Sequence, residues 1–515
     1  MKHIFTALPA LLLAAMLFTA CAVPAPADDA KASGADTLPA VEADISAVSG
    51  TVVTDIPAAP AAEAESASLT VLPVRVEGAI FGAPAGESVS AELRFDPQWL
   101  TAADNTVYHK GLAAACALLS ADVYYREKDL AHGTQNRVLI DGTDPEAYSF
   151  SALLTALGFE DVRFIESYKT GSYETDTNDS ATMLLGYLPF DGCDCFVAVV
   201  RGCSSAGEWS STFDVGNDSA EYAALTGEHP EWTDLSVPKG LSVAAERAMS
   251  FLNGYIAEHD DPSRENAVLV TGHSRGAALA ELIGMRLENT PGVKSFAYAF
   301  NSNPVTTDAA AQDCRTVFNV LDSADLYSDI HPFANGPFYR CGTVLALPVS
   351  EREDIRGAIE TLRGEGSYVC PDAALTGTYV SLFGELFPDR GSLYEPVTLT
   401  ESFTDLTAAE QRRDTCVSLI GSEAGLGLEA FCSLGEITEN GDGTCSFTVT
   451  ACGGAYLECL GMVCAYGAPA ADAVKALFPS VTALCSLADI VTANNSTIVG
   501  GHLLSNTYVL TGYAG

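Results

Sequence analysis

Ser274 stands in the run Gly272-His273-Ser274-Arg275-Gly276, which matches the pattern G-x-S-x-G. A pattern this short gains meaning only from its structural context. Residues 267–270 before it are apolar and predict a buried strand, and the Ala-rich residues 277–288 after it predict a helix. A sharp strand-to-helix turn exposes the serine hydroxyl and directs a helix N-terminus toward developing negative charge. The pattern therefore predicts that Ser274 attacks a carbonyl carbon as a nucleophile.

A serine hydroxyl needs a base to accept its proton, and histidine is the usual one. His273 should point away from its neighbour Ser274, and His259 should lie at the opposite end of the sheet. The chain order Ser, Asp, His leaves His331 and His502, and His331 is too near the best acid candidates to occupy a loop of its own. His502 is therefore the favoured base. The eight histidines are His3, His109, His132, His229, His259, His273, His331 and His502.

The acid that orients the base should follow a later strand of the same sheet. An apolar run over residues 316–321 predicts that strand, and Asp322, Asp325 and Asp329 follow it. Spacing alone does not choose among the three carboxylates. Any of them would be partly buried and would hold one tautomer of the imidazole.

Strands and helices must alternate to place these loops at one edge of a sheet. Short apolar runs predict buried strands, and longer runs with helical spacing predict helices between them. This alternation predicts an α/β fold whose mostly parallel central sheet is covered by helices on both faces. Strands are expected at 195–200, 267–270, 293–300 and 316–321, and helices at 112–125, 241–259 and 277–288. Residues 69–95 are expected to form an antiparallel hairpin before this alternation begins.

Several segments together resemble the class 3 lipases. TGHSRGAALAEL (271–282) is similar to the family's nucleophile turn, FVAVVRGCSSAGEW (196–209) to its oxyanion strand, and VPKGL (237–241) to a further motif. FNVLDSADLYSDIHP (318–332) and HLLSNTY (502–508) resemble the acid and histidine segments.

The resemblance implies an α/β-hydrolase that cleaves ester or lipid substrates without a cofactor. It implies that Ser274, His502 and Asp325 form the catalytic triad, and that the backbone N–H groups of Cys203 and Arg275 form the oxyanion hole. Cys203 stands where the family has Thr or Ser, so one hydroxyl contact to the oxyanion is lost. Arg275 replaces an apolar residue, and its side chain would lie across the helix start or favour an anionic substrate group.

His502 follows Asp325 by 177 positions, a larger separation than compact members of the family have. Residues 69–340 are therefore expected to form the hydrolase core, and residues 493–515 its last part, which carries the histidine. Residues 341–492 are expected to form a large mixed insertion that caps the site or selects substrates. Within the insertion, helices are expected at 351–363, 407–420 and 470–487, and a hairpin at 434–451.

The N-terminal residues have the features of an export signal. Lys2 precedes a short apolar run, and Phe18-Thr19-Ala20-Cys21 resembles a bacterial lipobox. Residues 1–20 are thus expected to be a signal peptide and Cys21 to be lipidated, with an ordinary signal peptide as the alternative. Residues 21–68 are rich in Ala, Pro and acidic residues, which predicts a disordered tether. We expect an extracellular lipoprotein of the bacterial cell envelope whose only membrane attachment is this lipid.

Composition excludes some functions and leaves others open. The net charge of −41 argues against nucleic acids as partners. Fourteen cysteines besides Cys21 permit disulfides or buried thiols, and their spacing predicts no metal site. Besides an esterase or lipase, the sequence allows an inactive binding protein on the same fold. It also allows a related hydrolase of amides, thioesters or cell-wall acyl groups.

Overall fold

The computed structural model describes most of the chain from residue 66 onward. It describes residues 66–84, 86–125, 136–168, 180–204, 208, 212, 237–306, 308–326, 328, 338–369, 373–388, 396–421, 426–428, 432–494 and 500–514. The expected signal peptide, Cys21 and nearly all of the expected tether lie outside these ranges. None of the described helices combines the length and apolar character needed to cross a bilayer.

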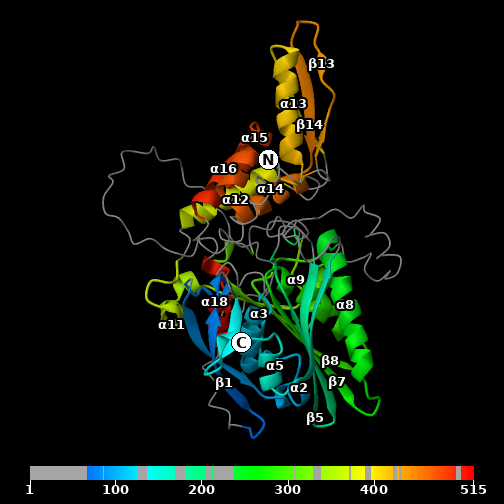
Figure 1. Ribbon diagram of the computed structural model, residues 1–515, viewed down its shortest axis with the longest axis vertical. Helices are drawn as coiled ribbons and strands as arrows, with labels where there is room; N and C mark the ends of the chain where they lie inside the picture. The colour runs from blue at the N-terminus through cyan, green and yellow to red at the C-terminus, as the bar shows by residue number, and fades with distance from the viewer. Residues whose placement is uncertain are drawn as a thin grey trace.

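A seven-stranded sheet forms the centre of the larger, lower part of the molecule in Figure 1. Its strands are, in spatial order, β10 (Thr343–Leu347), β9 (Val317–Asp322), β8 (Val293–Phe300), β7 (Glu265–His273), β6 (Cys193–Val200), β5 (Ser180–Phe190) and β4 (Glu160–Tyr168). The pairs from β6 to β10 are parallel, whereas β4, β5 and β6 pair antiparallel. This mostly parallel sheet confirms the predicted α/β-hydrolase fold. The antiparallel strands β4 and β5 were missed in the sequence.

Helices cover both faces of the central sheet, as the sequence predicts. On β6, Phe196, Ala198 and Val200 pack into a core with α8 (Lys239–His259) and α9 (Arg275–Glu288). The alternate residues of the strand face a second core, which includes α3 (Lys110–Asp122) and α18 (Leu504–Thr511). Successive side chains of a strand point to opposite faces, so a strand buried on both faces has a continuous apolar sequence.

A smaller sheet packs beside α3 near the N-terminus of the described region. The predicted hairpin is present as β1 (Thr70–Glu77) and β2 (Ser88–Phe95), and β3 (Arg137–Ile140) extends it. The remaining helices of the hydrolase part are α2 (Gln98–Thr101), α5 (Ala152–Ala156), α11 (Glu353–Arg363) and the 3-10 turns η1 (Ala79–Phe81), η2 (Pro145–Ala147), η4 (Ala309–Asp313) and η5 (Val349–Glu351). β3 was also missed in the sequence.

Residues 373–494 form a second module (Figure 1), and its core also takes in Leu326 and Phe338 from the segment that follows β9. Its elements are α12 (Ala373–Leu386), β11 (Val397–Phe403), α13 (Leu406–Ile420), β12 (Cys432–Leu434), β13 (Thr438–Glu439), β14 (Cys445–Ala451), α14 (Gly453–Tyr466), α15 (Ala468–Leu477) and α16 (Thr482–Ala493). The predicted hairpin is present as β13 and β14. The single helix predicted over 470–487 is instead two helices, because Pro479 follows α15 and cannot continue it.

The hydrolase part extends further along the chain than expected. β10 pairs with β9 as an edge strand of the central sheet, although the sequence placed it beyond Cys341 in the insertion. α11 also packs on the hydrolase core, through Ile355 and Ile359. A Cβ atom on Gly500 would lie 3.4 Å from the carbonyl oxygen of Val369. The chain therefore leaves the hydrolase part and returns to it at one place.

Candidate active site

Ser274 lies at the turn between β7 and α9, as the sequence predicts. Its backbone has φ 58° and ψ −128°, a strained conformation for a residue with a side chain. Its backbone N–H donates to the carbonyl oxygen of Phe300 at 2.9 Å, which fixes the turn to the end of β8. The residue is partly exposed, whereas the three residues on each side of it are buried. The turn therefore leaves Ser274 accessible at the carboxyl ends of the parallel strands.

Glycine at two positions of the motif allows this turn to pack tightly. A Cβ atom on Gly276 would collide with the backbone of Val200 and Gly202 at the end of β6. A Cβ atom on Gly272 would collide with the backbone of Gly276 itself. The first turn of α9 is consequently pressed against the segment that follows β6.

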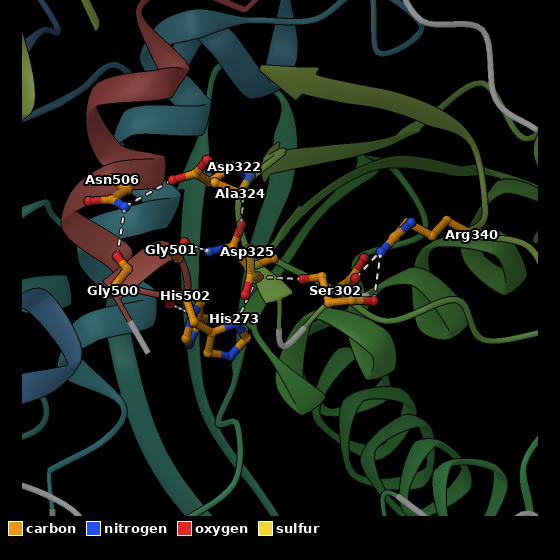
Figure 2. Close-up of polar contacts among 12 residues, drawn as sticks. His273, Ser302, Asp322, Ala324, Asp325, Arg340, Gly500, Gly501, His502 and Asn506 are labelled. Atoms are coloured by element: carbon orange, nitrogen blue, oxygen red, sulfur yellow. Dashed lines mark hydrogen bonds and ion pairs between the residues drawn. The ribbon is translucent and has the colours of Figure 1, made fainter. Parts of the chain in front are cut away.

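His502 and Asp325 form a hydrogen-bonded pair (Figure 2). The imidazole Nδ1 lies 2.8 Å from Oδ2 of Asp325, whose side chain is fully buried. Ser328 also donates a hydrogen bond to that oxygen, at 2.5 Å. A carboxylate oxygen accepts hydrogen bonds, so Nδ1 carries the proton and Nε2 is the basic nitrogen. This is the tautomer that a general base next to a serine requires.

Asp322, another acid candidate, has different partners (Figure 2). It accepts hydrogen bonds from the backbone N–H of Ala324 at 2.9 Å and from Asn506 Nδ2 at 3.0 Å. Burial raises the pKa of Asp322 to about 7, and the nearby charge of Asp325 adds to the increase. Asp322 thus braces the acid loop, while Asp325 contacts the imidazole. The third candidate, Asp329, and the alternative base His331 lie outside the described residues.

The histidine loop is held next to the serine turn. His273 Nε2 lies 2.7 Å from the carbonyl oxygen of His502, and the two imidazole centroids are 4.6 Å apart. On the other side, a Cβ atom on Gly501 would collide with the backbone of Ala324 and Asp325. The three residues proposed for the triad come from distant segments of the chain to the carboxyl ends of the parallel strands. They are Ser274, Asp325 and His502.

The two predicted oxyanion donors lie on segments that pack against each other. Arg275 is the first residue of α9, where backbone N–H groups have no acceptor within the helix. Cys203 follows β6, and its Sγ lies 3.3 Å from Oγ1 of Thr212. The close packing at Gly276 brings the helix N-terminus against this segment. The two segments that carry these N–H groups thus pack against each other next to the turn of Ser274.

The Arg275 side chain lies inside the protein and not on its surface. It is 1% exposed, and its Nη1 donates to the carbonyl oxygen of Ser180 at 2.9 Å. Of the two positions considered for this side chain, the structure favours burial beneath the helix start. An anionic substrate group has no direct access to a guanidinium buried in this way.

A buried ionic cluster holds the segment after β6, residues 201–204, in which the sequence placed an oxyanion donor, and the sequence did not reveal this cluster. Arg201 pairs with Glu166 at 3.0 Å and with Glu208 at 3.2 Å. Glu208 also accepts hydrogen bonds from the backbone N–H and hydroxyl of Ser204, at 2.5 and 2.9 Å. Burial would raise the pKa of Glu208, but the positive charges of Arg201 and Arg275 hold it below its ordinary value. The carboxylate is therefore ionised and fixes the loop after β6.

Two other histidines within the described ranges have structural roles away from Ser274. His109 accepts the backbone N–H of Leu112 at the start of α3. His259 lies 2.8 Å from Asp161 and stacks on Tyr187, at the end of α8. Both positions agree with their exclusion as the base. His3, His132 and His229 lie outside the described residues.

The described ranges contain no cluster of three side chains suited to a metal ion and no disulfide.

A family model supports the resemblance seen in the motifs. The model described as lipase (class 3) matches residues 197–333. This part of the chain is similar to class 3 lipases. The match spans the oxyanion segment, the serine turn and Asp325, and it ends before the second module and His502. No curated protein matches the chain.

Solved structures with some similarity are fungal lipases. Lip2 lipase from Yarrowia lipolytica is 14% identical with a TM-score of 0.28, over 45% of this chain and 76% of that one. The Rhizomucor miehei lipase propeptide complex is 20% identical with a TM-score of 0.27, over 43% and 63%. A triacylglycerol lipase from Penicillium expansum is 17% identical with a TM-score of 0.24, over 38% and 72%.

Proposed function

We propose that the protein is a serine hydrolase that cleaves carboxylic esters, of the esterase or lipase type. The observation that carries the proposal is the hydrogen bond between His502 and Asp325, on a loop held beside the strained turn of Ser274. The match of residues 197–333 to class 3 lipases supports the same chemistry.

In the proposed reaction, the hydroxyl oxygen of Ser274 forms a bond to the ester carbonyl carbon while Nε2 of His502 accepts its proton. Asp325 stabilises the imidazolium and keeps its orientation. The carbonyl oxygen becomes an oxyanion, which the backbone N–H groups of Cys203 and Arg275 stabilise. The carbon–oxygen bond to the alcohol then breaks, and His502 returns the proton to the leaving oxygen. Water releases the acid from Ser274 by the same steps.

Labelling with a fluorophosphonate probe tests the proposal, because only an activated serine reacts. Wild-type protein should be labelled and should hydrolyse p-nitrophenyl esters. Ser274→Ala should be neither labelled nor hydrolytic, with little change in thermal stability. Ser263→Ala, in the exposed loop before β7, serves as the control and should behave as wild type. Labelling of Ser274→Ala, or turnover above a tenth of wild type, would rule out this nucleophile.

The same assay separates the alternative functions. A binding protein without activity would be neither labelled nor hydrolytic, whereas an amide or thioester hydrolase would be labelled and would prefer those substrates. A series of p-nitrophenyl esters of increasing acyl length would then define the substrate class of an active enzyme.

We further propose that Cys21 carries the lipid that attaches the protein to the bacterial cell envelope. The lipobox-like run ending at Cys21 supports this placement, since acyl attachment needs the thiol. Cys21→Ser should move the protein from the membrane fraction to the soluble fraction. A variant that stays with the membranes would show that another feature anchors it.

A further inference from the structure

The loop that carries His502 is fixed through its main chain. Three successive carbonyl oxygens each lie at hydrogen-bond distance from a buried side chain (Figure 2). Asn506 Nδ2 donates to Gly500 at 2.9 Å, Asn301 Nδ2 donates to Gly501 at 3.1 Å, and His273 Nε2 lies 2.7 Å from the oxygen of His502. The donors come from α18, from the end of β8 and from the end of β7. The position of the base is thus tied to the central sheet itself.

His273 differs from the two asparagines because its donor depends on a tautomer. A carbonyl oxygen only accepts hydrogen bonds, so Nε2 of His273 must carry a proton. Burial holds the pKa of His273 well below its ordinary value, and the neighbouring His502 lowers it further. The ring is therefore neutral, and Nδ1 is an acceptor. A neutral ring also avoids placing a cation against His502, which must become positive during catalysis.

Tyr124 selects this tautomer from the opposite side of the ring. Its hydroxyl lies 3.0 Å from Nδ1 of His273 and can donate to it. Burial raises the pKa of Tyr124 well above its ordinary value, so the hydroxyl stays protonated. The hydroxyl also packs against Gly202, where an added Cβ atom would collide with it. Gly202 precedes Cys203 in the oxyanion segment. A packing contact at Gly202 and two hydrogen bonds, through Tyr124 and His273, thus connect the segment after β6 to the loop that carries His502.

We propose that Tyr124 and His273 are positioning residues that hold His502 in register with Ser274 and the oxyanion segment. This inference rests on the proposed ester hydrolysis. It gives a role to the histidine of the G-x-S-x-G run, which the sequence predicted only to point away from the nucleophile. The hydrogen-bonded pair acts through the backbone of His502 and touches neither the substrate nor the reacting atoms.

Two substitutions of His273 test the proposal, one that removes the N–H donor to the carbonyl oxygen of His502 and one that keeps such a donor. His273→Leu replaces the imidazole with an apolar side chain that has no donor. It should lower kcat by roughly 10- to 100-fold, as small misplacements of catalytic groups do. KM for p-nitrophenyl esters should change by less than about twofold, because His273 makes no contact that binds the substrate in its ground state. His273→Gln places an amide Nε2–H near the imidazole Nε2–H and should restore most of kcat.

Thr271→Val is the matched control, because it removes another buried donor from the same strand. Thr271 Oγ1 donates to the carbonyl oxygen of Tyr298 at 2.8 Å and does not contact the base loop. Its kcat should stay near that of wild type. If Thr271→Val and His273→Leu lose kcat equally, or if His273→Gln is no better than His273→Leu, the loss is structural and the proposal is wrong.

Nitrogen NMR of the histidine rings provides a second readout that does not depend on turnover. The signals of His273, assigned by their absence in His273→Gln, should show a neutral Nε2–H tautomer that does not titrate between about pH 5 and pH 8. Tyr124→Phe should shift the Nδ1 signal and lower kcat. A ring protonated on Nδ1 alone, or one that titrates near its ordinary pKa, would overturn the inference.

The failures of the two proposals are distinguishable. A wild-type protein that is neither labelled nor hydrolytic removes the proposed function and this inference with it. A wild type that depends on Ser274, together with a fully active His273→Leu variant, removes only the inference.

Discussion

The hydrolase part and the second module differ in what they bury. The hydrolase part encloses many charged or strongly polar side chains, among them Asp325, His273, Arg201 and Glu281. Between residues 373 and 494, Glu458 is the only charged or polar side chain that is buried in the described ranges. Burying a charge is costly unless it is paired, so such groups concentrate where chemistry or precise positioning requires them. The second module is therefore held mainly by apolar packing, whereas the buried polar groups, including those of the proposed site, lie in the hydrolase part.

The largest expected effect is loss of turnover when the buried acid or base of the hydrolase part is changed. His502→Ala and Asp325→Asn should each lower kcat by about 10³-fold or more, because the triad acts as a unit. The double variant Ser274→Ala/His502→Ala should be little worse than either single one. Steady-state hydrolysis of p-nitrophenyl esters measures these values.

Asp322→Asn is the matched control for Asp325→Asn. The pKa of Asp322 is raised to about 7, so this carboxyl is partly neutral near pH 7 and an amide resembles its protonated form. Its loss of kcat should be mild. An Asp322→Asn variant as inactive as Asp325→Asn would show that the chemistry is not confined to the pair with His502.

A substitution in the core of the second module should have the opposite effect, because it should lower stability and leave the reactivity of Ser274 unchanged. Phe447 is 2% exposed and stacks on Phe403, with ring centroids 5.6 Å apart. Phe447→Ala should lower the free energy of unfolding by about 3–5 kcal/mol, as large-to-small changes in a core do. Fluorophosphonate labelling of the folded protein should keep its wild-type rate.

Val417→Ala is the control for Phe447→Ala, since Val417 is 52% exposed on α13 of the same module. Its stability should be nearly that of wild type. A large fall in the labelling rate of folded Phe447→Ala would break the comparison, because the module would then shape the active site directly.

The smallest expected effect is a change in the pH dependence of stability. Glu281 is fully buried on α9, and burial raises its pKa from 4.5 to about 8. Between these values the folded state keeps a proton that the unfolded state releases, so this group lowers stability as pH rises from about 5 to 8. Glu281→Gln should therefore lose less in Tm over that interval than wild type.

Thermal unfolding followed by circular dichroism at several pH values provides the measurement for Glu281→Gln. Glu265→Gln, at the exposed start of β7, is the control and should keep the wild-type slope. An unchanged slope in Glu281→Gln would show that Glu281 is ionised in the folded protein, against the direction of its pKa.

Sequence reasoning was most successful where one short segment contained both a motif and its scaffold. The turn at Ser274 is of this kind, because the flanking strand and helix are visible in the same fifteen residues. It failed for β4 and β5, whose antiparallel pairing depends on partners that no local pattern reveals. It also missed β10 and Glu208, since the edge strand and the buried ion pairs follow from tertiary contacts. The pairing of His502 with Asp325 was accessible only through chain order and resemblance.

The contact between Val369 and Gly500 has a consequence for how such a chain can arise. The segment between them starts and ends at one point of the hydrolase part, so a genetic insertion there need not disturb the sheet register. Loop-closure entropy rises only slowly with length, which makes even a long insertion tolerable when its ends meet. A shorter ancestor in which a single turn joined these two residues would have contained His502, Asp325 and Ser274 in the same fold.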